Sequence, residues 1–310
     1  MGGTLSMLRS ARPQACGPQQ TKQHPHSRVT LLSLTDRLPL TCTRLGTCCH
    51  GHRILVSPWE LAWLAHGLGV TPRELRDARM VLGGTQLTAD GPLGVHGPAA
   101  HRVPACTLYD SVLGCRAHQQ RPLACRLYPL GRQRLAGVIR YHHPGSALPC
   151  LELCPTVGEL PTRTVGDYLR EQEITASEAA HDGYAALAYG LVKAALVISD
   201  AGLVDRAHLL NRFTLFRTWS GDQRAAHLPS HWYDLLTIPD LEVGADAAAF
   251  VAAHGQLLAS RLHGEFMGKT AADALVEAAE LDLLLALHLG STVGTDPAVM
   301  ATLVQGASSP

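Results

Sequence analysis

The sequence contains very little lysine. Of its 26 Lys and Arg residues, only Lys22, Lys193 and Lys269 are lysine, so arginine carries almost all of the basic charge. It also has no run of about 20 apolar residues, the length that a membrane span requires. The N-terminus lacks the compact apolar segment of a secretory signal peptide. From these absences we expect a cytoplasmic protein that does not partner with a membrane.

The signatures of several enzyme classes are absent as well. The chain has no Gly-x-Ser-x-Gly, no His-Glu-x-x-His and no phosphate-binding loop. No Gly-x-Gly-x-x-Gly sequence follows a strand and opens a helix, which is the usual pattern of a dinucleotide site. The sequence therefore identifies no catalytic or cofactor-binding residue, and it leaves open whether the protein is an enzyme.

Composition and charge indicate a folded protein with two unlike parts. The chain is 46% hydrophobic and 17% charged, as folded proteins are. Residues 1–172 carry 19 Arg and Lys against 10 Asp and Glu, whereas residues 173–310 carry 7 against 16. Such an asymmetry suggests two parts with different roles. We predict a flexible leader over 1–38, a cysteine-cluster metal-binding domain over 39–172 and an acidic helical region over 173–310.

Local patterns predict a mainly α fold. Ser57-Pro58-Trp59-Glu60 and Thr71-Pro72-Arg73-Glu74 are capping boxes, and each predicts the start of a helix. Residues 83–104 are rich in Gly and Pro and are predicted to be a loop. Residues 105–145 look irregular with short strands, for example over 136–141. Helix is expected again from about 164, and apolar stripes predict helices throughout 173–310.

Eight of the nine cysteines fall between positions 42 and 154. Thiols gathered in an intracellular chain usually hold a metal, whereas disulfides belong to oxidising compartments. The adjacent pair at 48 and 49 also argues against disulfides, and the ninth cysteine, Cys16, stands in the leader and is not expected to be a ligand. The predicted metal ligands are Cys42, Cys48, Cys49, Cys106, Cys115, Cys125, Cys150 and Cys154.

The metal itself stays open at this point, because thiolate sulfur suits both zinc and iron–sulfur clusters. Two four-thiolate sites, or one iron–sulfur cluster with a zinc ion, would each use all eight cysteines. A histidine in the same stretch is an alternative ligand in place of a thiol. The candidates are His50, His52, His118, His142 and His143.

The stretch between Ser111 and Leu151 contains no acidic residue but several arginines. A basic surface of this kind can bind nucleic acid. No nucleic-acid motif or interleaved aromatic residue accompanies it, however, so we do not expect nucleic acid as a partner. We interpret the arginines instead as balancing the negative charge of a thiolate–metal centre. They are Arg116, Arg121, Arg126, Arg132, Arg134 and Arg140.

Over residues 40–170 the chain resembles the YkgJ-type cysteine-cluster family, whose members are described as zinc- or iron-chelating domains. The family pattern pairs a Cys-x2-Cys-Gly-x-Cys-Cys run with a later Arg-Pro-x-x-Cys-Arg-x-Tyr-Pro run, and flagellin lysine N-methylases share it. The matching residues are Cys42, Gly46, Cys48, Cys49, Gly114, Cys115, Arg121, Pro122, Cys125, Arg126, Tyr128 and Pro129. Leu45 stands where the family has its second cysteine, and His118 stands where Tyr is usual.

The resemblance implies a zinc- or iron-binding protein, or one with an iron–sulfur cluster, of undefined activity. Shared motifs also imply an alternative, an S-adenosylmethionine-dependent protein lysine N-methyltransferase, and S-adenosylmethionine is a cofactor only under this alternative. A third hypothesis is an adaptor in which the metal staples one domain and the acidic helical region binds a protein partner. Because fold and motif do not fix chemistry, the three remain open at the level of sequence.

Overall fold

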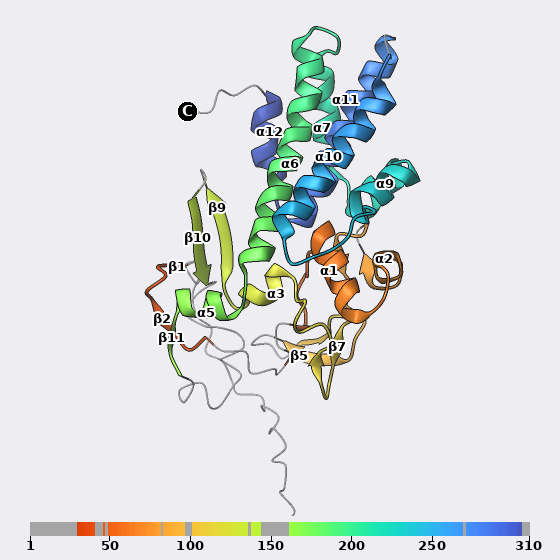
Figure 1. The fold of residues 1–310 in the computed structure, drawn as a ribbon. Helices are drawn as coiled ribbons and strands as arrows, with labels where there is room; N and C mark the ends of the chain where they lie inside the picture. The colour runs from red at the N-terminus through yellow and green to blue at the C-terminus, as the bar shows by residue number, and fades with distance from the viewer. Residues whose placement is uncertain are drawn as a thin grey trace, which may run out of the picture.

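The computed structural model describes residues 30–40, 46, 49–81, 83–96, 101–135, 138–143, 161–268 and 271–305. Within these residues it has eleven helices and a set of short strands, so the predicted fold class is confirmed. Long helices form a bundle at one end of the molecule, and short helices with the small sheets lie beneath it (Figure 1). The predicted leader over 1–38 lies mostly outside the described residues.

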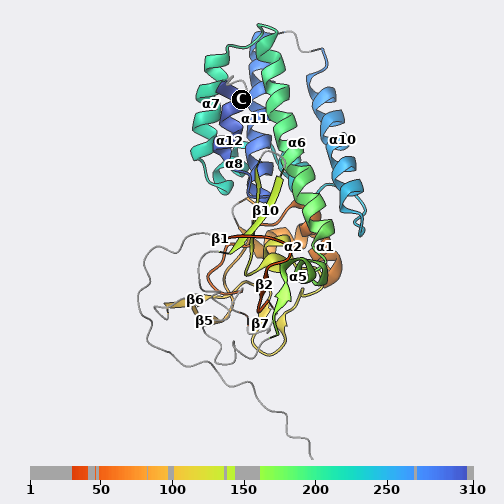
Figure 2. The same ribbon diagram turned by 90° about the vertical axis from the view of Figure 1, so that its left-hand side faces the viewer.

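The bundle is formed by the C-terminal part of the chain and is built around α6. The apolar stripes of the bundle helices are buried as predicted, and Leu209 and Phe213, both on one such stripe, are fully enclosed. The helix α6 packs lengthwise against α10 and α11 (Figure 2). The helices of the bundle are α6 (Thr175–Asp200), α7 (Arg206–Thr218), α8 (Gly221–His227), α9 (Ser230–Thr237), α10 (Ala247–Phe266), α11 (Ala272–Thr292) and α12 (Pro297–Gln305).

The helix α6 corrects one expectation from the sequence. Among the described residues it is long and apolar enough to cross a membrane, judged by length and composition alone. The expectation that no segment would qualify is therefore wrong for α6. In the structure 39% of the most apolar window of α6 is buried, and α6 packs against α10 and α11. A helix in the core of a folded domain can meet the same criteria of length and composition.

The two capping boxes form as predicted. Ser57 caps α1 (Pro58–Leu68) and Thr71 caps α2 (Pro72–Arg79), and in each box the glutamate at the third helical position bonds back to the capping residue. Proline stands at the first helical position of both helices, where its missing N–H costs nothing. Gly69 ends α1 in the left-handed conformation, at φ 68°.

The strands are short, and all described pairs are antiparallel. The largest sheet has the order β1 (Thr30–Leu32), β10 (Val138–His143), β9 (Gly131–Leu135). Four two-stranded sheets pair β2 (Arg37–Leu38) with β11 (Arg163–Thr164), β3 (Met80–Val81) with β4 (Gln86–Leu87), β5 (Leu93–His96) with β6 (His101–Pro104), and β7 (Tyr109–Asp110) with β8 (Gly114–Cys115). Residues 83–104, predicted to be a loop, therefore contribute three of these strands.

Polar contacts join the two ends of the molecule. The guanidinium of Arg76, on α2, is 5% exposed; it pairs with Asp234 on α9 at 2.8 Å and lies 4.5 Å from the ring centre of Tyr233. The backbone carbonyl of Gly83 accepts a hydrogen bond from Nε2 of His288, on α11, at 2.9 Å. Burial lowers the pKa of His288 to about 4, so this imidazole is neutral at physiological pH.

Candidate metal centre

The backbone brings Cys49 and Cys106 together. The amide of Cys106 donates to the carbonyl of Cys49 at 2.6 Å, and the next residue pair outward, His50 and Ala105, forms an antiparallel bridge. Gly46 precedes this segment at φ 76°, and a Cβ there would lie 2.3 Å from the Tyr109 ring. Only glycine adopts this positive φ without strain and leaves room for the Tyr109 ring, which explains why the cysteine motif has a glycine at this position.

A β-hairpin returns Cys115 to the same place. Tyr109 stands opposite Cys115 in the β7–β8 register, and the amide of Tyr109 donates to the carbonyl of Cys106 at 2.9 Å. The hairpin turn is held by Asp110, whose carboxylate accepts bonds from the amides of Val112 and Leu113. These bonds lower the pKa of Asp110, so it is ionised at neutral pH.

Cys125 comes from the short helix α3 (Leu123–Leu127), which follows Pro122. The start of α3 is fixed by Glu60 of α1, whose Oε1 accepts a hydrogen bond from the Leu123 amide at 2.7 Å. Glu60 is 1% exposed, and its other oxygen, Oε2, accepts bonds from Ser57 and from Nε2 of His181 on α6. Burial acts to raise the pKa of Glu60, but His181 and the backbone amides outweigh it and lower the pKa.

The four cysteines face one small cavity of about 20 Å³, which is the space of roughly one water molecule. No Asp, Glu, Lys or Arg is among the described residues of its wall. The described wall consists of Cys49, Cys106, Cys115 and Cys125 with Ile54, Leu64, Leu87, Leu108, Tyr109, Ala117 and Pro122. Four soft donors in an apolar shell are the chemistry that zinc and thiolate-bound iron prefer.

The donor set is incomplete within the described residues. There, no three His, Cys, Asp or Glu side chains are arranged to hold a metal ion by themselves. Four of the eight predicted ligands, Cys42, Cys48, Cys150 and Cys154, lie outside the described residues, as does Leu45. The structure therefore brings four predicted ligands to one cavity and leaves the assignment of all eight as a prediction.

The arginines of the acid-free stretch do not line this cavity. Arg121 donates to the carbonyl of His118 and the side chain of Gln172, and Arg126 donates to the carbonyls of Arg121, Gln119 and Gln172. These bonds tie α3 to the end of α5 (Val165–Glu171). Burial lowers the pKa of Arg126 and a neighbouring charge on Arg121 adds to this effect, while Glu173, Glu60 and Cys125 act in the opposite direction.

Other arginines of that stretch pair with acids. Arg132 bonds to Glu178 and Asp182 on α6, and Arg116 lies 3.7 Å from Asp110. Arg132 and Arg116 therefore have acidic neighbours of their own, and the interpretation that the arginines balance a metal centre stays a prediction. Their acidic partners at 178 and 182 belong to another part of the sequence, and the acid-free stretch alone gives no sign of them.

The five histidines considered as substitute ligands are all described, and none lines the cysteine cavity. Nδ1 of His50 bonds to the carbonyl of Gly46 at 2.8 Å, and the ring meets Tyr109 edge-on. The ring of His52 packs against Tyr128 in the same way. Sequence reasoning recognised Glu60 only as a helix cap; no signal in the sequence indicates its bond to Leu123 or to His181.

Comparison with known proteins bears on this cavity directly. Residues 41–140 match the family model described as "CxxCxxCC: Putative zinc- or iron-chelating domain". The matched range contains the four cysteines of the cavity and two of the predicted ligands outside the described residues. A search of curated proteins and a search of solved structures gave no match.

Proposed function

We propose that this protein, whose residues 41–140 form a CxxCxxCC domain, holds a zinc or iron ion in a thiolate site that stabilises its N-terminal half. Cys49, Cys106, Cys115 and Cys125 are the candidate ligands of this site, and the predicted ligands outside the described residues would serve a second site or a cluster. The observation that carries the proposal is that two backbone pairings, Cys49 with Cys106 and the β7–β8 hairpin, and the helix α3 bring these four cysteines to a single cavity.

A stabilising role is favoured over a catalytic one by the chemistry of the cavity wall. The described wall is apolar apart from the sulfurs, so it offers no carboxylate or imidazole for proton transfer. A catalytic metal also keeps an open ligand position for water or substrate, and a cavity of about 20 Å³ leaves little room for one. No feature of the described residues favours the methyltransferase alternative.

The proposed setting is the cytoplasm, because a thiolate site needs cysteines that stay reduced. The bundle, rich in Asp and Glu, is then the part of the molecule that would meet a protein partner, as in an adaptor. The charge imbalance over 173–310, 16 acidic against 7 basic residues, is the feature that supports such a partner.

Metal content tests the proposal. Protein made under reducing, metal-replete conditions should contain zinc or iron by elemental analysis, and its absorption spectrum separates colourless zinc from coloured thiolate-bound iron. Cys125→Ser should lose metal, because the serine hydroxyl is a poor ligand in place of the thiolate. Cys16→Ser is the matched control and should keep the metal content of the unmodified chain. The proposal fails if the unmodified protein has neither metal, or if Cys125→Ser retains all of it.

A further inference from the structure

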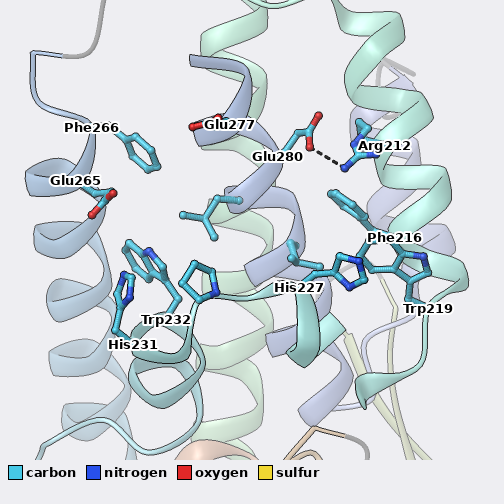
Figure 3. A pocket seen from close by; sticks show the side chains of 13 residues that line it. Arg212, Phe216, Trp219, His227, His231, Trp232, Glu265, Phe266, Glu277 and Glu280 are labelled. Carbon is cyan, nitrogen blue, oxygen red and sulfur yellow. Dashed lines mark ion pairs between the residues drawn. The ribbon is translucent and has the colours of Figure 1, made fainter. Parts of the chain in front are cut away.

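A second cavity, of about 350 Å³, opens in the helical bundle away from the cysteines. Four aromatic rings line it: Phe216 and Trp219 at the end of α7, Trp232 on α9 and Phe266 at the end of α10. In Figure 3 these rings stand on the two sides of the cavity, with side chains of α11 above them. Its volume is at the small end of the range for small-molecule sites.

Carboxylates form the other part of the wall. Glu277 and Glu280 lie three residues apart on α11, so both face the cavity, with Leu281 and Leu284 deeper along the same stripe. Glu280 is already bonded to Arg212 at 2.8 Å and to His208 at 2.7 Å. Glu277 is exposed, and no hydrogen bond or ion pair joins it to another described residue.

The wall has a negative balance of charge. Glu265 adds a third carboxylate, and Arg212 is the only Lys or Arg among the described lining residues. Arg212 pairs with Glu280 through Nη2 at 2.8 Å and lies 4.7 Å from the ring centre of Phe216, while its Nε has no hydrogen-bond partner among the described residues.

From this combination we propose that the bundle cavity binds a small organic cation, an ammonium group attached to an apolar body. Aromatic faces attract a cation through their ring quadrupole, and carboxylates at the rim attract it through charge. The acidic surroundings of the bundle raise the local concentration of cations further. This site is separate from the cysteine cavity, so its failure would leave the proposed metal function intact.

Benzyltrimethylammonium is a suitable probe, with benzyl alcohol and benzoate as its neutral and anionic counterparts. Binding to the full chain is measured by isothermal titration calorimetry and by quenching of tryptophan fluorescence, since Trp219 and Trp232 line the cavity. We expect saturable binding of the cation and at least about fivefold weaker binding of the other two, the size of a cation–π contribution of this kind.

Two variants and a control locate the site. Glu277→Gln changes only an exposed side chain, and Trp219→Leu removes an aromatic face; each should weaken cation binding by about fivefold. Glu242→Gln removes one exposed acid from the same half of the chain outside the cavity and should leave binding unchanged. The proposal is overturned if benzoate binds as tightly as the cation, if no probe saturates, or if Glu277→Gln binds normally. Tighter binding of a lysine-containing peptide than of the probe would overturn it in favour of a protein partner.

Discussion

Asp282 is an acidic side chain in the core of the bundle. It lies on α11 and is 6% exposed, and its Oδ1 has no hydrogen-bond partner among the residues that the structure describes. Burial raises the pKa of its carboxyl from 3.8 to about 7. The protonated form is therefore the one that the folded state favours, whereas the unfolded chain ionises near pH 4.

Because the folded pKa is raised, stability associated with Asp282 is present at low pH and is lost as pH rises from about 4 to about 7. We predict that Asp282→Asn raises the free energy of unfolding at pH 8 by several kcal/mol, on the order of 1.4 kcal/mol for each pH unit of pKa shift. At pH 5 the gain should be smaller by about 2 kcal/mol. Urea unfolding of both proteins at the two pH values measures this difference.

Asp273→Asn is the control for Asp282, since it removes an exposed acid from the first turn of the same helix. It should not gain stability, because a negative charge at a helix N-terminus is favourable. An Asp282→Asn protein with the same pH dependence as the unmodified protein would mean that this carboxyl is hydrated in solution.

At the scale of single residues, sequence reasoning located the cysteines well and the arginines poorly. Clustering along the chain was enough to indicate metal ligands, and four of them meet at one cavity. Besides its nearby partners, Arg126 bonds to Gln172, and Arg132 pairs with the acids of α6; these partners are more than 40 positions away. Charge patterns within one stretch contain no information about such distant partners.

Among the elements, α1 and α2 begin with the same capping box but have different surroundings. Glu60 of α1 is buried and also holds the Leu123 amide and His181, whereas Glu74 of α2 bonds only within its own box and is exposed. The N-terminus of α1 is thus joined to α3, which carries Cys125, and to α6 of the bundle. The two helices form a natural pair for comparison.

We predict that Glu60→Gln lowers the free energy of unfolding by about 2–4 kcal/mol, because an amide has one acceptor oxygen where the carboxylate uses two. Metal affinity should fall as well, since the start of α3 loses its anchor. Glu74→Gln keeps an acceptor for its local cap and should change neither quantity by a comparable amount. Thermal unfolding and metal titration of the two variants test this; equal effects would show that Glu60 acts only as a cap.

How well an element could be predicted depends on where its stabilising contacts lie. The helices α1 and α2 have their signals inside the chain segment itself, in Ser57, Thr71 and the residues after them, and both were predicted. The strands β4, β5 and β6 are two to four residues long and exist through pairing with other segments. Nothing in the Gly- and Pro-rich stretch over 83–104 distinguishes them from a loop.

At the scale of the whole molecule, the buried apolar side chains of the described residues form three clusters. One fills the bundle, one lies between α3 and α5, and the third packs around the cysteine cavity with Leu61 and Leu64 of α1. The helix α1 belongs to two of them, because Trp59 and Ala62 on its other face join the bundle cluster. The predicted boundary near residue 173 is untested, yet α1 already packs into the core of the part beyond that boundary.

This division predicts how the protein responds when the metal site is broken. Cys125→Ser should loosen the cluster around the cavity, since structural thiolate sites contribute on the order of 10 kcal/mol to folding when complete. Hydrogen exchange measured by mass spectrometry should speed up over 105–127, while α6 and α11 keep most of their protection, because none of the described cysteines belongs to the bundle cluster. Within α1 the expected effect is intermediate. Limited proteolysis should likewise cut first within 40–170 and leave a C-terminal fragment. If α6 and α11 instead lose as much protection from hydrogen exchange as residues 105–127 do, the molecule unfolds as a single cooperative unit that depends on its metal.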